Sequence, residues 1–287
     1  MLDDNDLQKY SEIARRIRFD VIKMTYHAGS GHPGGSMSIA EILTILYFKH
    51  LAHRPSEPHW ENRDRVILSK GHACPALYAV LAEAGYYPRD EMWTLRKFGS
   101  RLQGHPALDR GLPGIEVSTG SLGQGISIAV GIALSFKHLD NNHRRVYTIL
   151  GDGEIEEGQV WEAFMAAGHY HLDNLVAIID NNDLQIDGFV SDVMNVHPIF
   201  DKMKAFNWYP IVAEGHDFNS LNSAFEQAKQ VKGMPVTIIA KTVKGKGISY
   251  MENVAGWHGK APNRELAIKA VEELGFQQSA LDKDVAK

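Results

Sequence analysis

Two polar turns, each at the end of an apolar run, constrain the fold of this chain more than any other feature. The motif GDG (151–153) follows the run 146–150, and the pair NN (181–182) follows the run 175–180. Both runs are short and rich in Val and Ile, which is typical of strands buried in a parallel sheet. Residues 157–171 between them have a helical pattern. The order predicted is therefore strand, acidic turn, crossover helix, strand and polar turn.

The positions of these turns suggest a ligand site. Ligands of open parallel sheets bind where the strands end, so Asp152 and Asn182 are predicted to offer two hard oxygens to one cation. Gly151 and Gly153 would let phosphate oxygens approach the backbone closely. A second interpretation stays open from these residues alone: Gly, Asp and Asn are common in turns, and both pairs could be ordinary strand-end turns.

The rest of the chain alternates between strand and helix patterns. This alternation predicts an α/β fold with one parallel β-sheet and helices on both faces. Ser38 and Glu41 form a capping-box pattern, and Pro75 fits the first turn of a helix. Residues 85–114 are rich in turn residues. Further strands are predicted at 65–68, 209–213 and 235–241, and helices at 7–28, 42–51, 123–138, 195–206, 217–231 and 264–274.

Length and composition favour a single domain spanning residues 1–287, with a polar and mobile tail at 277–287. A net charge of −5 argues against a nucleic-acid surface. The single cysteine, Cys74, excludes an internal disulfide and favours a cytoplasmic location. Residues 1–6 are acidic and unlike a signal peptide, and the apolar stretch 126–136 is too short to span a bilayer, so no membrane association is expected.

The spacing of GDG and NN resembles the signature of thiamine diphosphate enzymes, and other segments resemble transketolase, in transketolase order. The resemblance extends from about residue 15 to residue 262. It implies a thiamine-diphosphate-binding fold, namely the diphosphate-binding domain of that family. It also implies thiamine diphosphate and Mg²⁺ as cofactors, with Ca²⁺ or Mn²⁺ as substitutes. The further segments are SGHPGG (30–35), LSKGHA (68–73), GHP (104–106), TGSLGQG (119–125), DNNDLQIDG (180–188), GHD (215–217) and WHGK (257–260).

The resemblance assigns metal and cofactor contacts to particular residues. The Asp152 carboxylate, the Asn182 amide oxygen and the Leu184 carbonyl oxygen would hold the metal, an oxygen set that suits Mg²⁺. Asn182 and Gly153 would also contact the cofactor. The backbone at 120–122 would pass close to the cofactor rings. Many family members have Pro where Ser121 stands, which argues against a contact from that side chain. The three residues assigned to this segment are Gly120, Ser121 and Leu122.

Four histidines are singled out because each stands beside a glycine: His32, His72, His105 and His258. Each is predicted on a tight turn, although any one alone is more readily explained as a capped or core histidine. The resemblance implies that His72 and His258 contact the cofactor. It also implies that His32, His105 and His258 line the sugar-phosphate channel as catalytic residues, since imidazole moves protons near neutral pH. Nine others are predicted to be structural or solvated: His27, His50, His53, His59, His138, His143, His169, His171 and His197.

Two further charged residues are assigned through the resemblance. Lys244 lies in the basic, glycine-rich loop 241–247 and would reach the cofactor phosphates, with Lys260 as a weaker candidate. From the residues alone, this loop is equally well explained as a solvated charge run. Glu157 matches a family glutamate behind the GDG turn, where it would join an acidic network near the cofactor at the subunit interface. The alternative for Glu157 is the N-terminal charge of a helix.

The resemblance covers only the first of the three domains of a single-chain transketolase. It therefore implies the N-terminal subunit of a split transketolase. The expected partner is a C-terminal subunit with the pyrimidine-binding and C-terminal domains, in an α2β2 assembly. The expected reaction transfers a two-carbon ketol unit from a ketose phosphate to an aldose phosphate in the pentose phosphate pathway.

Two other interpretations stay open. The first is a subunit of another thiamine diphosphate enzyme, similar to deoxyxylulose-phosphate synthase or to 2-oxo-acid dehydrogenases. The segments around His32, His105 and His258 fit transketolase better than either. The second is a chain that binds the cofactor and only regulates a partner. The presence of Asp152, Asn182 and the four histidines argues against this second interpretation.

Overall fold

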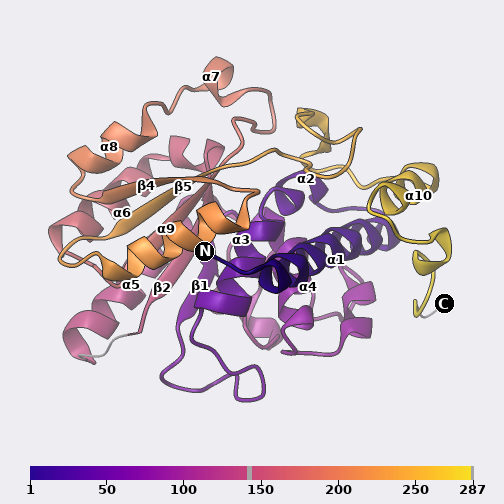
Figure 1. Cartoon of the computed structure of the whole chain (residues 1–287), viewed down its shortest axis with the longest axis horizontal. Coiled ribbons are helices and arrows are strands. Elements are labelled where there is room, and N and C mark those ends of the chain that lie inside the picture. The colour runs from indigo at the N-terminus through magenta and orange to yellow at the C-terminus, as the bar shows by residue number, and fades with distance from the viewer. Residues whose placement is uncertain (141–143, 286–287) are drawn as a thin grey trace.

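Five parallel strands form the centre of the molecule (Figure 1). The structure, a computed structural model, describes residues 1–140 and 144–285. The strand order in the sheet is β1-β2-β3-β5-β4, and every neighbouring pair is parallel. The parallel sheet predicted from the sequence is therefore confirmed. Its strands are β1 (Arg65–Leu68), β2 (Val146–Gly151), β3 (Leu175–Asn181), β4 (Tyr209–Glu214) and β5 (Val236–Lys241).

Helices cover both faces of the sheet, as predicted (Figure 1). Ile149 of β2 points into one apolar core, and its neighbour Leu150 points into the other, because successive strand residues face opposite sides. The first core contains residues of α1 (Asp4–Ala28), α3 (Ala40–Ile45), α4 (Cys74–Glu83), α9 (Phe218–Gln230) and α10 (Arg264–Glu273). The second contains residues of α5 (Gln124–Leu134), α6 (Gly158–His169) and α8 (Ile199–Ala205).

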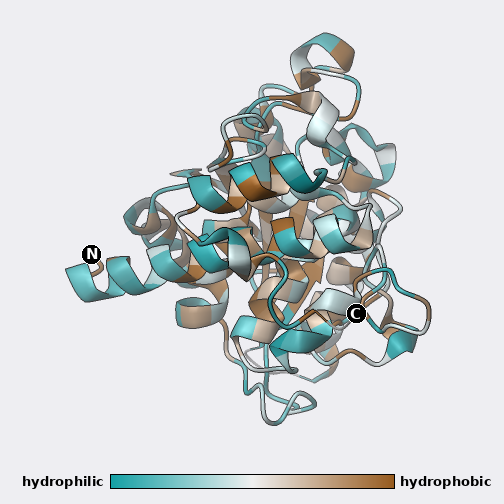
Figure 2. Cartoon of the chain, turned by 90° about the vertical axis from the view of Figure 1, so that its right-hand side faces the viewer, coloured by the Kyte–Doolittle hydropathy of each residue, from teal (hydrophilic) through white to brown (hydrophobic). Residues whose placement is uncertain are grey.

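Helix α1 begins three residues before the predicted start. The Asp3 side chain caps it by accepting a hydrogen bond from the Asp6 N–H at 2.8 Å, and this cap precedes the apolar stripe on which the prediction relied. The helix ends as predicted before Gly29, whose φ of 64° suits a glycine. Viewed from the side, the first turns of α1 are hydrophilic, and hydrophobic residues gather toward the middle of the molecule (Figure 2).

The predicted capping box at Ser38 and Glu41 is wrong. Helix α3 has no side-chain cap. The Ser38 hydroxyl instead donates to Asp180 at 2.6 Å, and Glu41 accepts two hydrogen bonds from Arg18 at 2.6 Å. Both side chains are buried, so charged and polar partners from distant segments override the local pattern.

Several predicted helices differ in extent from those in the structure. The prediction for 195–206 corresponds to the shorter α8, and the short α7 (Val190–Val193) was not predicted. The predictions for 42–51 and 123–138 correspond to α3 and α5, each continued by a wider π-helical turn. The structure places Pro75 in the first turn of α4, as predicted. The additional short elements include α2 (Pro33–Met37), the π turns Leu46–His50 and Ser135–Leu139, and 3-10 turns at Gly71–Ala73, Arg89–Thr94, Leu108–Arg110, Gly153–Glu156, Ala255–Trp257 and Gln278–Ala280.

The C-terminal segment, predicted to be a mobile tail, packs against the core as far as Val285, the last residue that the structure describes. Leu281 is fully buried in the core beside α1, and Lys23 of α1 donates to the Ala280 carbonyl at 2.9 Å. Asp282 forms an ion pair with Arg264 of α10 at 2.7 Å. One apolar side chain and two cations on neighbouring helices thus hold a segment whose composition is mostly polar.

Among the described residues, no helix is both long enough and apolar enough to cross a membrane.

Candidate functional site

The carboxyl ends of the parallel strands surround a cavity of about 210 Å³. Segments far apart in the sequence meet there because parallel strands all end at the same edge of the sheet. Nine residues with a predicted role line this cavity: His72, Leu122, Gly151, Asp152, Gly153, Asn182, Leu184, Lys244 and His258. Five other lining residues have no predicted role: Gly35, Lys70, Glu154, Gln185 and Ile186.

Asp152 is buried at the end of β2 and accepts several hydrogen bonds. The donors are the Gly153 N–H at 2.9 Å, the Asn181 side-chain amide at 3.1 Å, and the Asp183 N–H. Burial, reinforced by the nearby Asp180 carboxylate, raises the pKa of Asp152 to about 6. These three donors orient the carboxylate and none of them is a cation, which suits Asp152 to receive one.

Asn182 and Leu184 supply further oxygens beside Asp152. The Asn182 side-chain N–H donates to Asp180 at 2.9 Å, and this contact fixes the orientation of the amide. Its Oδ1 accepts from the Leu184 N–H at 3.1 Å. Among residues 1–140 and 144–285, no cluster of three or more His, Cys, Asp or Glu side chains could hold a metal ion. The three predicted ligands are one carboxylate, one amide and one carbonyl, so further oxygens would come from a bound diphosphate and from water.

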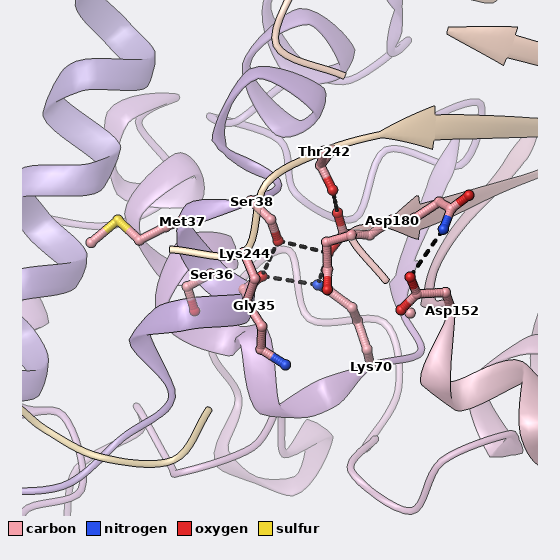
Figure 3. Close-up of polar contacts among 12 residues, drawn as sticks. Gly35, Ser36, Met37, Ser38, Lys70, Asp152, Asp180, Thr242 and Lys244 are labelled. Atoms are coloured by element: carbon pink, nitrogen blue, oxygen red, sulfur yellow. Dashed lines mark hydrogen bonds and ion pairs between the residues drawn. The ribbon is translucent and has the colours of Figure 1, made fainter. Parts of the chain in front are cut away.

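Beside these oxygens lies a buried ion pair that the sequence analysis missed (Figure 3). Lys70, which is 2% exposed, contacts Asp180, which is 0% exposed, at 2.5 Å. Ser38, Asn182 and Thr242 also donate to Asp180. Burial by itself would raise the pKa of Asp180, but Lys70 and these hydrogen bonds outweigh it and lower the pKa. The available signal was a Lys two residues after β1 and an Asp near the end of β3, because both positions lie at the sheet edge that carries the site.

The glutamate that lines the cavity is Glu154 and not the predicted Glu157. Glu154 is buried and accepts hydrogen bonds from Ser69 at 2.5 Å, Gly123 N–H at 3.0 Å and Gly151 N–H at 3.1 Å. It therefore joins the GDG turn to the start of α5. Glu157 is exposed at the N-cap of α6, outside the cavity lining. That position fits the helix-terminus alternative and leaves Glu157 accessible to a partner.

The four singled-out histidines lie together. The ring centroid of His32 is 5.6 Å from that of His72, 5.6 Å from that of His105 and 5.7 Å from that of His258. The rings of His72 and His258 are 4.7 Å apart. Burial, followed by neighbouring cations, lowers the pKa of each ring, to about 4 for His32 and about 3 for His258. The imidazoles are therefore neutral at pH 7 in the free chain.

The segment 120–122 lies against the four histidines, next to His105. Gly120 has a φ of +145°, and a Cβ there would lie 2.9 Å from Cδ2 of His105, so only glycine fits. Leu122 lines the cavity, whereas the Ser121 side chain is exposed. The structure thus brings Gly120 and Leu122 into the site and gives the Ser121 side chain no part in lining it.

Lys244 extends into the cavity after β5. It is 3% exposed, and its Nζ donates to the Leu184 carbonyl at 2.9 Å and lies 3.0 Å from Nδ1 of His258. Burial, then the charge of Lys70, lowers the pKa of Lys244 to about 8. Lys260 is exposed, with its Nζ over the Trp257 ring at 5.2 Å, so it takes no part in the cavity.

A chain of hydrogen bonds holds the loop that carries Lys244. His216 accepts from the Val243 N–H at 2.8 Å through Nε2 and donates to Glu41 at 2.9 Å through Nδ1. Burial would raise the pKa of Glu41, but Arg18 and His216 lower it to about 2. The loop is therefore tied to α1 and α3, which restricts where Lys244 can reach.

Most other histidines have structural surroundings, as predicted. His50 stacks on Phe225, and His53 lies between Tyr47 and Tyr86. His27 contacts the Leu281 carbonyl at 2.8 Å. His143 lies outside the residues that the structure describes.

The residues of the cavity fit a magnesium diphosphate group. Hard oxygens from Asp152, Asn182 and Leu184 line it together with the cationic side chains of Lys70 and Lys244. The backbone also leaves little room for side chains: a Cβ on Gly35 would lie 3.3 Å from Nε2 of His72, and one on Gly153 would lie 2.9 Å from Cβ of Gln185. Apart from Lys70, the resemblance assigned these charged and oxygen ligands, and the structure places them around one cavity.

Comparisons with known proteins agree with this arrangement. Residues 9–286 match the family described as transketolase, thiamine diphosphate binding domain. The 6-deoxy-6-sulfo-D-fructose transketolase subunit of Clostridium sp. (strain MSTE9) is 44% identical over 94% of this chain and 96% of its own length. An apulose-4-phosphate transketolase subunit of Phocaeicola vulgatus is 40% identical over 92% of this chain and 93% of its own.

A solved structure, transketolase from Leishmania mexicana, superposes with a TM-score of 0.90 at 33% identity. It is matched over 96% of this chain but only 43% of its own length, so the chain spans less than half of that relative. The family match and the full-length subunit relatives lead to the same assignment. The chain belongs to the family of transketolase N-terminal, thiamine diphosphate-binding domains.

Proposed function

We propose that this chain is the cytoplasmic N-terminal subunit of a split transketolase. It would transfer a two-carbon ketol unit from a ketose phosphate to an aldose phosphate, as in the pentose phosphate pathway, with thiamine diphosphate and Mg²⁺. One observation carries this proposal: Asp152, Asn182 and Leu184 share a cavity with Lys244, His72 and His258, and His32 and His105 lie beside it.

Each group has a role in this proposal. Asp152, Asn182 Oδ1 and the Leu184 carbonyl would hold Mg²⁺, and Lys244 and His72 would neutralise the diphosphate. Thiamine diphosphate, when bound, supplies the stabilisation of the carbanion that ketol transfer requires. His32, His105 and His258 would orient the sugar hydroxyls and exchange protons with them at their ring nitrogens.

The pKa of Asp152 predicts a pH dependence for metal binding. A metal ligand must be deprotonated, and the pKa of this carboxyl is raised to about 6. Mg²⁺-dependent affinity for the cofactor should therefore be constant above this value and fall about tenfold per pH unit below it. Calorimetric titration between pH 5 and 8 measures the slope. Asp152→Asn, which does not titrate, isolates the contribution of the cofactor phosphates; equal slopes in both proteins would contradict the prediction.

Replacement of His258 tests the catalytic assignment. Its Nδ1 lies 3.0 Å from Lys244 Nζ, and its ring is 4.7 Å from that of His72, so it sits between the diphosphate side and the sugar side of the site. His258→Ala should lower kcat roughly 10²- to 10⁴-fold while cofactor still binds. The matched control is His169→Ala at the exposed end of α6, which should keep normal activity. A normal rate for His258→Ala would reduce His258 to a structural role.

The partner in this proposal is a C-terminal transketolase subunit, in an α2β2 assembly. The clostridial relative, which is itself named a subunit, is covered over 96% of its length, and the Leishmania chain over 43%. Beside the cavity, the segment after Leu184 exposes apolar side chains: Ile186 is 62% exposed and Met194 60% exposed. Such a patch next to the proposed cofactor site suits coverage by a second subunit.

The names of two relatives suggest further candidates for the donor sugar. One is named for 6-deoxy-6-sulfo-D-fructose and the other for apulose 4-phosphate, and both match nearly the full length of this chain. A sulfonated or branched donor is therefore a second candidate beside an ordinary ketose phosphate. Other thiamine diphosphate reactions remain alternatives, as does a regulatory chain without activity.

A reconstitution assay separates these possibilities. The chain is mixed with the protein encoded beside it, thiamine diphosphate and Mg²⁺, and ribose 5-phosphate is offered with xylulose 5-phosphate, the sulfonated fructose or apulose 4-phosphate. Two-carbon transfer that occurs only in the mixture, and not with either chain separately, would support the split enzyme. The preferred donor would identify the substrate. Cofactor binding without transfer from any donor would contradict it.

A further inference from the structure

Arg96 lies beside His32, and the function proposed above gives it no role. Its Nη1 donates to Ser30 Oγ at 2.9 Å, and its Nη2 lies 3.3 Å from Nδ1 of His32 and 3.4 Å from the Gly104 carbonyl oxygen. None of these partners is an anion. Within residues 1–140 and 144–285, no carboxylate lies at ion-pair distance from this half-buried guanidinium.

The backbone around Arg96 is specialised for this placement. Arg96 has a φ of 61°, which is uncommon for a residue with a side chain, and its N–H donates to the Leu102 carbonyl at 2.8 Å. At Gly104 a Cβ would lie 2.9 Å from Cζ of Arg96, so the guanidinium packs against the Gly104 backbone at a place where a side chain would displace it. Strained backbone of this kind is retained where surrounding contacts determine it, and such positions cluster at functional sites.

The hydrogen-bonding chemistry of arginine then decides the state of His32. A guanidinium only donates hydrogen bonds, so Nδ1 of His32 has to be the acceptor and carry no proton. In a neutral imidazole the single proton is then on Nε2. We propose that Arg96 is a positioning residue that fixes His32 as the Nε2–H tautomer, so that His32 acts as a hydrogen-bond donor and not as a proton acceptor at Nε2.

The charges around His32 support the same conclusion. Burial lowers the pKa of His32 to about 4, with further lowering from Arg96, His105 and Lys244. The rings of His72 and His258 face it at 5.6 and 5.7 Å and are themselves neutral at pH 7. A neutral donor suits a sugar oxygen that gains negative charge. This step rests on the proposed function, and it replaces the proton exchange assigned to His32 there with hydrogen-bond donation from Nε2.

Nitrogen NMR of the histidine side chains tests the tautomer directly, in the chain alone. With ¹⁵N-labelled histidine, His32 should show a protonated Nε2 and an unprotonated Nδ1 at pH 7, and His32→Asn assigns its signals by their loss. Arg96→Met should populate the Nδ1–H tautomer and raise the pKa of His32 toward the ordinary value of about 6.5. Arg96→Lys keeps a cationic donor and should largely retain the wild-type pattern. Lys97→Met, an exposed cation one residue on, should change neither.

Two results would overturn the proposal: a proton on Nδ1 in the wild-type chain, or an unchanged tautomer and pKa in Arg96→Met. Even if Arg96→Met does not fold, the wild-type spectrum shows which ring nitrogen of His32 carries the proton. In the reconstituted enzyme, Arg96→Met should lower kcat roughly tenfold or more, with partial rescue in Arg96→Lys. If no donor supports transfer, the proposed function fails while the tautomer result still stands by itself.

Discussion

Replacement of Asp152 with alanine should weaken Mg²⁺-dependent binding of thiamine diphosphate at least about 100-fold. Loss of an outer-sphere partner of a metal ligand already costs about 10- to 100-fold in metal affinity, and Asp152 is proposed as a direct ligand. It is also the one carboxylate among the three proposed ligand groups. Calorimetric titration of the cofactor, with and without Mg²⁺, measures the effect on the chain and on its mixture with the partner.

The control for this experiment is Asp187→Ala. Asp187 is an exposed carboxylate on the same connection after β3, and its removal changes the net charge by the same amount. Affinity should stay normal in this variant. If Asp152→Ala kept wild-type affinity in the presence of Mg²⁺, Asp152 would not be a metal ligand, and the assignments of Asn182 and Leu184 would lose their support.

The second large effect is expected at the buried ion pair. Asp180→Asn removes the carboxylate that contacts Lys70 at 2.5 Å and leaves an ammonium group buried without its anion. Breaking a buried pair by removing one partner costs about 3–5 kcal/mol, because the remaining charge is uncompensated. Lys70→Met should cost a similar amount. Equilibrium unfolding in urea gives the free energy of unfolding of each variant.

The double variant Lys70→Met/Asp180→Asn distinguishes the pair from its separate members. It buries no net charge, so it should be destabilised by clearly less than the sum of the single variants. Lys241→Met is a matched control: Lys241 and Glu214 are 3.7 Å apart with side chains 61% and 67% exposed. Removal of this exposed ion pair should change the free energy of unfolding by about 0.5 kcal/mol or less. Strict additivity of the two buried substitutions would show that Lys70 and Asp180 are not energetically coupled.

The sheet could be predicted because its strands are coded locally. Runs such as β2 and β3 are apolar, β-branched and followed by polar turns, and these features persist in any context. The helix caps were less predictable. Ser38 and Glu41 have a capping pattern, but Asp180 and Arg18 bind them instead, and neither partner is near in sequence. Tertiary contacts with buried charges outweigh a local preference of about 1 kcal/mol.

The candidate site shows the same limit. Asp152, Asn182 and the four histidines could be singled out by motif, and the structure brings them together. Lys70 and Asp180 also stand in motifs that the sequence analysis singled out, LSKGHA and DNNDLQIDG. Their pairing could not be predicted, because Lys70 follows β1 and has to reach past β2 to the end of β3. Glu154 was passed over for Glu157 because burial at a turn cannot be inferred from the spacing of acidic residues alone.

The contact between Lys244 and the Leu184 carbonyl has a consequence for the order of binding. One carbonyl oxygen serves both the ammonium of Lys244, at 2.9 Å, and the proposed metal. Two cations so close would repel each other, so the metal would bind once Lys244 leaves this carbonyl for an anion, and the diphosphate would supply that anion. Metal and cofactor should then raise each other's affinity by the same factor. Mg²⁺ titrations with and without thiamine diphosphate would measure this factor. In the absence of thiamine diphosphate, the chain should bind Mg²⁺ only weakly.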